Sequence, residues 1–140
     1  MQVFKIYGAM VAEIAAMKGL CQDILGGLII TESAGDPEAK SHCGAFGLTQ
    51  VMPATAKDKG YDLSTPFGQI FAGADYLAWI LKLFADGDIH LALAGYNAGP
   101  GRIKNNRWKR YKETVKYVPR VLGNAERYHA AREATNKKGG

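Results

Sequence analysis

The sequence predicts one mainly α domain, and three observations support this prediction. Apolar residues recur at helical spacing in several segments, whereas no segment is rich in strand signals and no internal repeat is evident. Proline, threonine, aspartate and glycine stand where helices typically begin and end. The 140 residues, 47% hydrophobic and 22% charged, suffice for a single hydrophobic core and have an ordinary globular composition.

Two helices are expected in the first third of the chain. Residues 3–18 and residues 22–33 both carry apolar side chains at helical spacing, and Gly35 is placed as the stop of the second helix. The pair Gly26-Gly27 inside that helix costs up to about 2 kcal/mol relative to alanines. We therefore expect another backbone to pack closely against these glycines.

A loop is expected next, over residues 36–47, with Asp36-Pro37 as its turn. At most, this segment forms a small irregular hairpin. A short helix then begins at Pro53, because proline is favoured at the first helical position.

The longest helix is expected to begin with Thr65 as N-cap and to end at Gly87. Asp88 caps a further helix, which the glycine-rich stretch 95–101 is expected to break abruptly. Such a tight turn is a common way to line a binding cleft.

The last expected helix covers residues 113–134, where Pro119 is tolerable if it lies in a first turn. Residues 1–135 are therefore expected to form the domain, and residues 136–140 a flexible basic tail.

Charge is distributed unevenly along the chain. From Gly101 onward there are 12 Lys and Arg against 3 Glu, a net +9, whereas the first 100 residues have 6 against 10 Asp and Glu, a net −4, which together give +5. A basic half suggests an anionic polymer as partner: nucleic acid, cell-wall polymer or membrane surface. A solvated helix face is an equally good interpretation.

No apolar run approaches the roughly 20 residues of a membrane span. The first 20 residues resemble a signal peptide, with Lys5 before an apolar stretch, but Glu13 and Lys18 interrupt that stretch and favour a mature amphipathic helix. We therefore expect no signal peptide in this chain and export by another route.

Neither a metal site nor a disulfide framework is indicated. Cys21 and Cys43 are too few for either, although a single bridge between them stays open. The three histidines, His42, His90 and His129, are too scattered for metal-ligand spacing. We expect no metal and no cofactor.

The candidate catalytic residue is Glu32, which directly follows the apolar residues of the second helix. Desolvation beside apolar residues raises the pKa of a carboxyl and suits it to act as a general acid. The alternative is a solvated charge at a helix end.

Hydrolysis of a glycosidic bond usually takes two carboxylates. Asp36, Glu38 and Asp58 are the nearby candidates for a second one, but Asp36 lies in a turn and Glu38 on the loop. Chemistry with a single carboxylate is therefore favoured, in which Glu32 gives a proton to the leaving oxygen and later takes one from a nucleophile carried by the substrate.

Three ordered blocks carry a family resemblance. They are Glu32-Ser33 followed by Ser41-x-x-Gly44-Ala45-x-Gly47-Leu48-x-Gln50-x-x-Pro53-x-Thr55-Ala56, then Ala94-Gly95-Tyr96-Asn97-Ala98-Gly99, and last Glu113-Thr114-x-x-Tyr117-Val118. In this order they resemble the signature of the soluble lytic transglycosylase family. The family has a lysozyme-like fold of the goose type, and its members cleave peptidoglycan.

The resemblance implies that Glu32 is the catalytic acid and base. It also implies that the sugar cleft is lined by Ser41, Gln50, Tyr96, Asn97, Glu113 and Tyr117. Ser41 and Gln50 offer hydrogen bonds to sugar substituents, and Tyr96 offers a stacking face. Structural roles are the alternatives for Asn97, as a cap, and for Glu113.

Two positions depart from the family pattern. Thr49 stands where methionine is frequent, and Gly95 where alanine is. Thr49 puts one hydrophobic contact with the substrate in doubt. Of the two tryptophans, Trp79 is expected in the core, and Trp108 is the better candidate for carbohydrate stacking.

The resemblance implies a lytic transglycosylase that cleaves the β-1,4 bond between N-acetylmuramic acid and N-acetylglucosamine and forms a 1,6-anhydromuramoyl end, with Glu32 as sole acid and base. The alternatives are a hydrolytic lysozyme of the same fold and a non-enzymatic wall-binding module. Peptidoglycan glycan strands are the expected partner rather than nucleic acid, and a monomer is expected. Without a signal peptide, the enzyme would reach the cell wall or periplasm from a phage lysate, a virion or a secretion apparatus.

Overall fold

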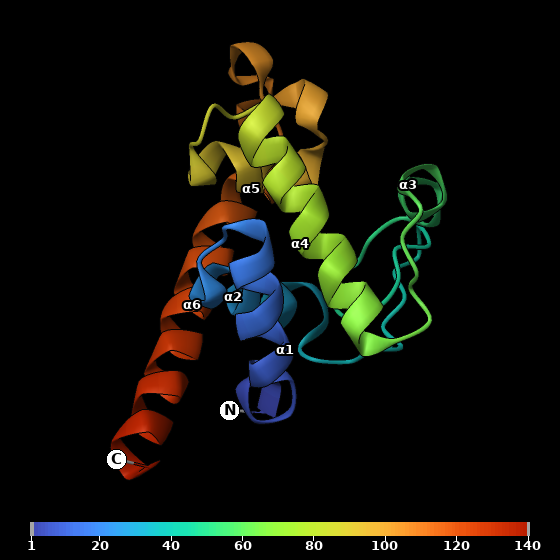
Figure 1. The fold of residues 1–140 in the computed structure, drawn as a ribbon. Helices are drawn as coiled ribbons and strands as arrows, with labels where there is room; N and C mark the ends of the chain where they lie inside the picture. Colours follow the sequence, from blue (N-terminus) through green and yellow to red (C-terminus); the bar gives the residue numbers. More distant parts are fainter. Residues whose placement is uncertain (1, 140) are drawn as a thin grey trace.

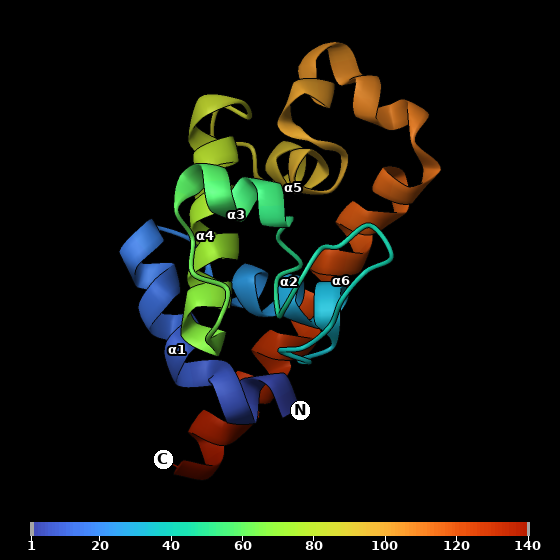
Figure 2. The ribbon, with the colours of Figure 1, turned by 90° about the vertical axis from the view of Figure 1, so that its right-hand side faces the viewer.

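The computed structural model describes residues 2–139, with side chains through residue 137, and its elements are helical (Figure 1, Figure 2). In chain order these residues form α1 (Gln2–Lys18), α2 (Gln22–Ser33), α3 (Pro53–Lys59), α4 (Pro66–Leu83), α5 (Ile89–Ala98), the 3₁₀ segments η1 (Pro100–Arg102) and η2 (Lys104–Arg110), and α6 (Lys112–Gly139). Extended pairing in this range is limited to two isolated antiparallel bridges, Lys40 with Phe46 and Phe46 with Val51. The prediction of a mainly α fold with at most a small irregular hairpin is confirmed.

The centre of the fold is the packing of α2 against α6, with α1 on another side of α2 (Figure 1). Gly26 and Gly27 make this approach possible. A Cβ atom at Gly27 would lie 2.6 Å from the backbone nitrogen of Ala125, and one at Gly26 would overlap the ring of Tyr128. The expected close approach of another backbone is thus confirmed, and that backbone belongs to α6.

The long helix α4 packs against α1 and α5. Its start follows the sequence signals: the Thr65 hydroxyl accepts a 3.0 Å hydrogen bond from the nitrogen of Gly68, and Pro66 is the first helical residue. The helix ends at Leu83, earlier than the expected stop at Gly87, which lies in the following turn with a φ of +81°. Asp88 caps α5 as predicted, accepting bonds from the nitrogens of His90 and Leu91.

The expectation that Gly95 begins a break is wrong. The helix α5 continues through Ala98, and the chain turns at Gly99, which has a φ of +100°. Gly95 serves packing instead, because a Cβ there would lie 3.0 Å from the Cγ2 of Ile80 on α4. The segment after the turn, which the sequence left unassigned, forms η1 and η2.

The last helix is longer than expected and contains Pro119 beyond its first turn. The carbonyl that loses a donor to this proline belongs to Val115, which lies on the exposed side of α6, where water can replace the missing hydrogen bond. Residues 136–139 continue the helix, and the domain end at residue 135 stays a prediction. The mobility of this end stays a prediction, and residue 140 lies outside the described residues.

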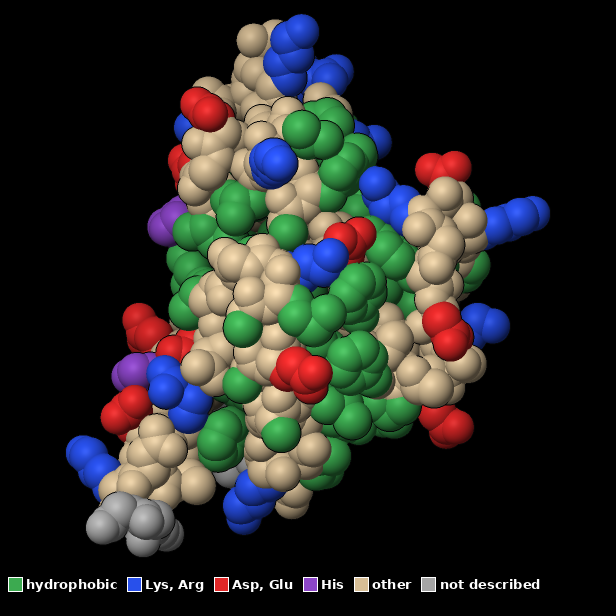
Figure 3. Space-filling model, viewed as in Figure 1, with side chains coloured by type: hydrophobic (Ala, Val, Ile, Leu, Met, Phe, Trp, Pro, Cys, Tyr) green, Lys and Arg blue, Asp and Glu red, His purple; other side chains and the backbone are tan. Residues whose placement is uncertain are grey.

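Basic side chains gather at the end of the molecule formed by η1 and η2 (Figure 3). In the part of the chain that the structure describes, no helix is long and apolar enough to cross a membrane. Cys21 and Cys43 are both free and exposed, which answers the open question of a bridge between them.

Candidate active site

Glu32 lies in the last turn of α2, and the packing of that helix aims it. Leu25, Leu28 and Ile29 are fully buried and fix the helix in the core. The helix then ends abruptly, because Ala34 adopts the left-handed conformation with a φ of 53°. Glu32 therefore lies at the edge of the hydrophobic core. One side of its carboxyl packs against protein, and the other side faces a cleft.

The carboxyl of Glu32 has an unusual electrostatic environment. Burial raises its pKa from the ordinary value of 4.5 to about 7, and the charge of Glu113 acts in the same direction. Two groups act in the opposite direction: the hydroxyl of Tyr117, which donates a 2.8 Å hydrogen bond to Oε2, and the charge of Arg120. Near neutral pH the group is therefore poised between its acid and base forms.

The loop between α2 and α3 forms one wall of the cleft, and Gln69 on α4 holds it. Its Oε1 accepts from the nitrogen of Leu48 at 2.8 Å, and its Nε2 donates to the carbonyls of Pro37 and Leu63. The hydroxyl of Thr49 adds a 2.6 Å bond to the Gln69 carbonyl. The sequence reasoning missed Gln69, because nothing local marks a glutamine on an amphipathic helix as a buried loop anchor.

Thr49 departs from the family pattern at a position that does not face the cleft. Its side chain is completely buried against α4, and its backbone carbonyl accepts the hydroxyl of Tyr96 at 2.7 Å. The sequence raised a doubt about a hydrophobic contact between residue 49 and the substrate. That doubt does not apply, because Thr49 supports the wall of the cleft from the side that faces α4.

Ser41 and Gln50 line the cleft, and each uses part of its polar side chain to hold the loop. The Ser41 hydroxyl oxygen accepts from the nitrogen of Ala45 at 3.0 Å, which leaves its proton available. The Gln50 amide donates both protons, to the carbonyls of Ala39 and Gly47, which leaves its Oε1 available. Gln50 also takes a positive φ of 53°. Both residues thus present one fixed polar atom.

The opposite wall comes from α5 and the first turn of α6, tied together by Asn97. Its Oδ1 accepts from the hydroxyl of Thr114 at 2.7 Å, and its Nδ2 donates weakly, at 3.4 Å, to Glu113. Asn97 lies inside α5 and caps nothing, so it bridges two helices instead. Burial raises the pKa of both Tyr96 and Tyr117 well above 10, so both phenols stay neutral donors.

These walls enclose a hollow of about 460 Å³. It is lined by Glu32, Ser41, His42, Cys43, Ala45, Gln50, Met52, Tyr96, Asn97 and Glu113. The structure therefore brings six of the seven predicted site residues to one hollow. Tyr117, the seventh, contacts it through the carboxyl of Glu32.

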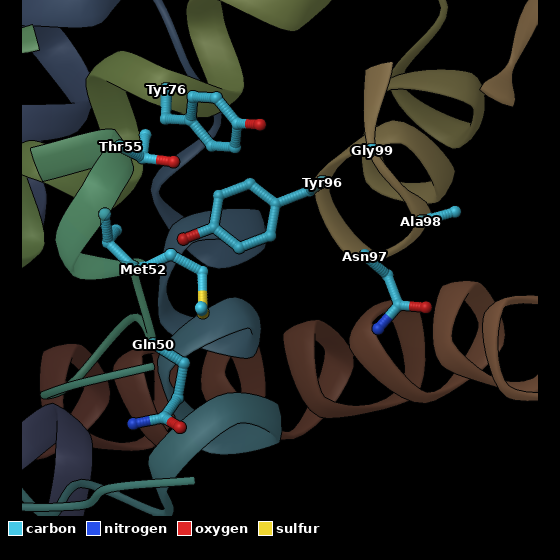
Figure 4. A pocket seen from close by; sticks show the side chains of 9 residues that line it. Gln50, Met52, Thr55, Tyr76, Tyr96, Asn97, Ala98 and Gly99 are labelled. Carbon is cyan, nitrogen blue, oxygen red and sulfur yellow. The ribbon is translucent and has the colours of Figure 1, made fainter. Parts of the chain in front are cut away.

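The hollow continues into a second one past Gln50, Met52, Tyr96 and Asn97, which line both. Figure 4 shows the ring of Tyr96 between the side chains of Met52 and Tyr76, with Asn97 to its lower right. A third hollow follows, sharing Thr55 and Tyr76 with the second. The three together form an elongated groove, the shape that a polymer requires.

Trp79 lines the far end of this groove as well as packing against the core. Its ring stacks on Tyr76 with centroids 5.8 Å apart, and the ammonium of Lys59 lies 3.6 Å from its centroid. Trp108, the better candidate from the sequence, packs against the core and buries its indole nitrogen without a partner among the described residues. Trp79 is thus better placed than Trp108 to stack on a carbohydrate.

Of the three carboxylates considered as partners for Glu32, none lines the hollow around it. Asp36 closes its turn by accepting from the nitrogen of Glu38, and Asp58 lines the far groove beside Trp79. The second carboxylate at this hollow is Glu113. Among the described side chains, no group of three or more His, Cys, Asp or Glu is arranged to hold a metal ion.

Comparison with known proteins agrees with this arrangement. Residues 9–118 match the family model described as the transglycosylase SLT domain. The transglycosylase of Enterobacteria phage PRD1 is 34% identical over 117 residues, which cover 79% of this chain and 42% of the phage protein.

Two solved structures share the fold. The 70 kDa soluble lytic transglycosylase of Escherichia coli superposes with a TM-score of 0.81 and 28% identity over 90% of this chain and 24% of its own. An inactive mutant of the lytic transglycosylase Slt from Pseudomonas aeruginosa gives a TM-score of 0.78 and 30% identity over 92% of this chain and 25% of its own.

The chain spans less than half the length of these relatives. The match nonetheless runs from α1 into α6 and includes Glu32 and every other predicted site residue. The fold is lysozyme-like, as expected from the three sequence blocks. The chain belongs to the transglycosylase SLT domain family.

Proposed function

We propose that this domain is a peptidoglycan lytic transglycosylase that cleaves the β-1,4 bond between N-acetylmuramic acid and N-acetylglucosamine. The observation that carries the proposal is Glu32, a desolvated carboxyl with a pKa of about 7 at the wall of an elongated groove. Membership of the family supports it. So does the inactive mutant of the Pseudomonas relative, in which one glutamate is replaced by glutamine.

In the first step, Glu32 protonates the glycosidic oxygen. A raised pKa keeps a large share of the carboxyl protonated near neutrality, which an exposed glutamate cannot do. The bond from C1 of the muramoyl residue to the leaving oxygen breaks, and positive charge develops at C1. The Glu32 carboxylate that remains receives the hydrogen bond from Tyr117.

In the second step, the C6 hydroxyl of the same muramoyl residue attacks C1. Its proton passes to Glu32, a bond forms between C1 and O6, and the 1,6-anhydro ring closes. The net reaction breaks one C–O bond, forms another and returns Glu32 to its acid form. No water is consumed and no cofactor is required.

The groove supplies the contacts that orient a glycan. The fixed Oε1 of Gln50 and the hydroxyl proton of Ser41 suit amide and hydroxyl groups of the sugars. The side chains of Met52 and Tyr76 offer apolar faces on either side of Tyr96 (Figure 4). The hydroxyl of Tyr96 is already bound to Thr49, so its ring rather than its hydroxyl is the part available.

A hydrolytic lysozyme is the second candidate, and Glu113 is the observation that favours it. This carboxylate lines the same hollow as Glu32 and accepts a weak hydrogen bond from Asn97, so it is a candidate for the second carboxylate that a hydrolase uses as its general base. In the transglycosylase reaction, Glu113 instead raises the pKa of Glu32 and binds substrate.

Digestion of purified peptidoglycan in water enriched with ¹⁸O separates the two. A transglycosylase releases muropeptides with 1,6-anhydro ends and no ¹⁸O, whereas a hydrolase releases reducing ends that contain ¹⁸O. Mass spectrometry of the products reads both features at once. Reducing ends with ¹⁸O as the main product, abolished by Glu113→Gln, would establish the hydrolase.

The partners and setting follow from the same proposal. Glycan strands of peptidoglycan occupy the groove, a monomer suffices to form it, and nucleic acid is not required. The basic half of the chain attracts the anionic wall, and this attraction weakens as salt rises. Similarity to a phage protein supports action at the bacterial cell wall after delivery by a phage.

A further inference from the structure

A further hollow, of about 340 Å³, lies along α6 outside the groove. It is lined by Arg120, Gly123, Asn124 and Arg127, and we call it the arginine hollow. Both arginines are exposed, and among the described side chains neither forms an ion pair. Arg132, farther along the same helix, contrasts with them, since Asp23 binds it at 3.0 Å.

The floor and one side of the arginine hollow are built into the fold. A Cβ atom at Gly123 would meet nothing within 4 Å, so the space between the two arginines is open. Asn124 is fixed from behind, because its Nδ2 donates a 2.9 Å hydrogen bond to the hydroxyl of Thr31. Its remaining amide proton and its Oδ1 are available for a ligand.

The arginine hollow adjoins the catalytic centre. Thr31, which anchors Asn124, directly precedes Glu32, and Tyr117 on α6 binds Glu32 itself. From Tyr117, Arg120 and Arg127 lie three and ten residues further along the helix, or roughly 4.5 and 15 Å along its axis. The charge of Arg120 lowers the pKa of Glu32, as expected for a short separation between the two groups.

We infer that the arginine hollow binds carboxylates of the stem peptide attached to the muramoyl residue in the groove, an inference that rests on the proposed function. Guanidinium groups bind carboxylates through paired hydrogen bonds. An extended stem of four or five residues reaches roughly 13 to 18 Å, which matches the span from Tyr117 to Arg127.

The spacing of the two arginines favours such a ligand over a single compact anion. They are seven residues apart on the same side of α6, or roughly 10 Å along the axis. One phosphate cannot contact both guanidinium groups at that separation unless the side chains converge, whereas a peptide that carries two carboxylates can. Neutral sugars alone would leave two cations at this place without a partner.

The test compares two substrates that differ only in the stem: intact glycan strands, and the same strands freed of peptide by an amidase. For the double variant Arg120→Gln/Arg127→Gln, kcat/KM for intact strands divided by that for stem-free strands is expected to fall about tenfold. Arg110→Gln on η2, which removes the same charge outside the hollow, is expected to leave this ratio within twofold of wild type. Thermal unfolding confirms that each variant is folded.

Binding to the wild-type protein gives a second readout. A free tetrapeptide stem, followed by NMR, is expected to shift the signals of Gly123 and Asn124, whereas a stem with its carboxylates amidated is not. An equal loss of kcat/KM on both substrates would overturn the inference, as would equal shifts with inorganic phosphate. If wild type releases no product from either substrate, the proposed function fails and this inference with it.

Discussion

The hydroxyl of Tyr117 donates a 2.8 Å hydrogen bond to Oε2 of Glu32, across 85 residues of sequence. It joins the end of α2 to the second turn of α6, the two helices whose packing forms the centre of the fold. The bond lowers the pKa of Glu32 against the larger effect of burial. Tyr117 therefore tunes how readily Glu32 gives up and recovers its proton.

Tyr117→Phe removes this donor, so the pKa of Glu32 is expected to rise above its present value of about 7. The alkaline limb of the kcat/KM profile should move to higher pH, and kcat should fall about tenfold because the carboxyl is less firmly oriented. The measurement is the rate of muropeptide release between pH 5 and 9.

Tyr128→Phe is the matched control, since the Tyr128 hydroxyl is buried and has no partner among the described residues. It is expected to leave both the limb and kcat unchanged. An alkaline limb at the wild-type position in Tyr117→Phe would contradict the role given to this hydrogen bond.

Glu32→Gln is expected to stabilise the fold at alkaline pH. The folded-state pKa of about 7 exceeds the ordinary value of 4.5, so the folded protein holds this proton more tightly than the unfolded chain does. Wild type therefore loses stability as pH rises from 4.5 through 7, by up to about 3 kcal/mol. Urea unfolding at pH 4.5 and pH 8 should show the advantage of the variant growing with pH. An advantage of the same size at both values would contradict the raised pKa.

Gly27→Ala is expected to destabilise the protein by about 3 kcal/mol. The added methyl group would collide with backbone atoms of Val121 and Ala125, which cannot move without separating α2 from α6. Gly123→Ala on α6 is the contrast, because its methyl group meets open space and should stabilise the helix by about 0.5 kcal/mol. The midpoint of thermal unfolding for each variant provides the comparison. Similar midpoints for the two variants would show that Gly27 does not set the distance between α2 and α6.

Gln69→Met is expected to cost about 3 kcal/mol and to loosen the wall of the groove. The substitution leaves the nitrogen of Leu48 and two carbonyls without partners in a buried place. Limited proteolysis should then cut between residues 36 and 52, and KM for glycan strands should rise. An intact loop together with an unchanged KM would rule out this anchoring role.

Local signals in the sequence predicted most of the helices and the residue at the centre of the site. Thr65 and Asp88 cap helices because their side chains satisfy backbone nitrogens only a few residues away. The pair Gly26-Gly27 predicted a contact with a distant segment, because two glycines inside a helix are costly unless another backbone packs closely against them. Six of the seven site residues that the three blocks implied line one hollow, and Tyr117 contacts it through Glu32.

The misses concern interactions between distant segments. The sequence suggested that Gly95 breaks its helix. In the structure Gly95 instead allows close packing against Ile80 of another helix. The η2 segment turns through Asn105 and Asn106, which adopt left-handed conformations. Asparagine tolerates such conformations, but its presence in a sequence does not predict them. Gln69 and the pair Arg120 and Arg127 lie on amphipathic helices, where only the tertiary fold distinguishes an anchor or a hollow from ordinary surface.

The most direct test of the account is the rate at which Glu32→Gln forms 1,6-anhydromuropeptides from purified peptidoglycan. The variant keeps the size and hydrogen-bonding capacity of the side chain but has no proton to exchange. If Glu32 is the sole acid and base, the rate should fall by about 1,000-fold or more, in a protein that still binds glycan strands. A folded variant that retains a tenth or more of the wild-type rate would contradict the central claim.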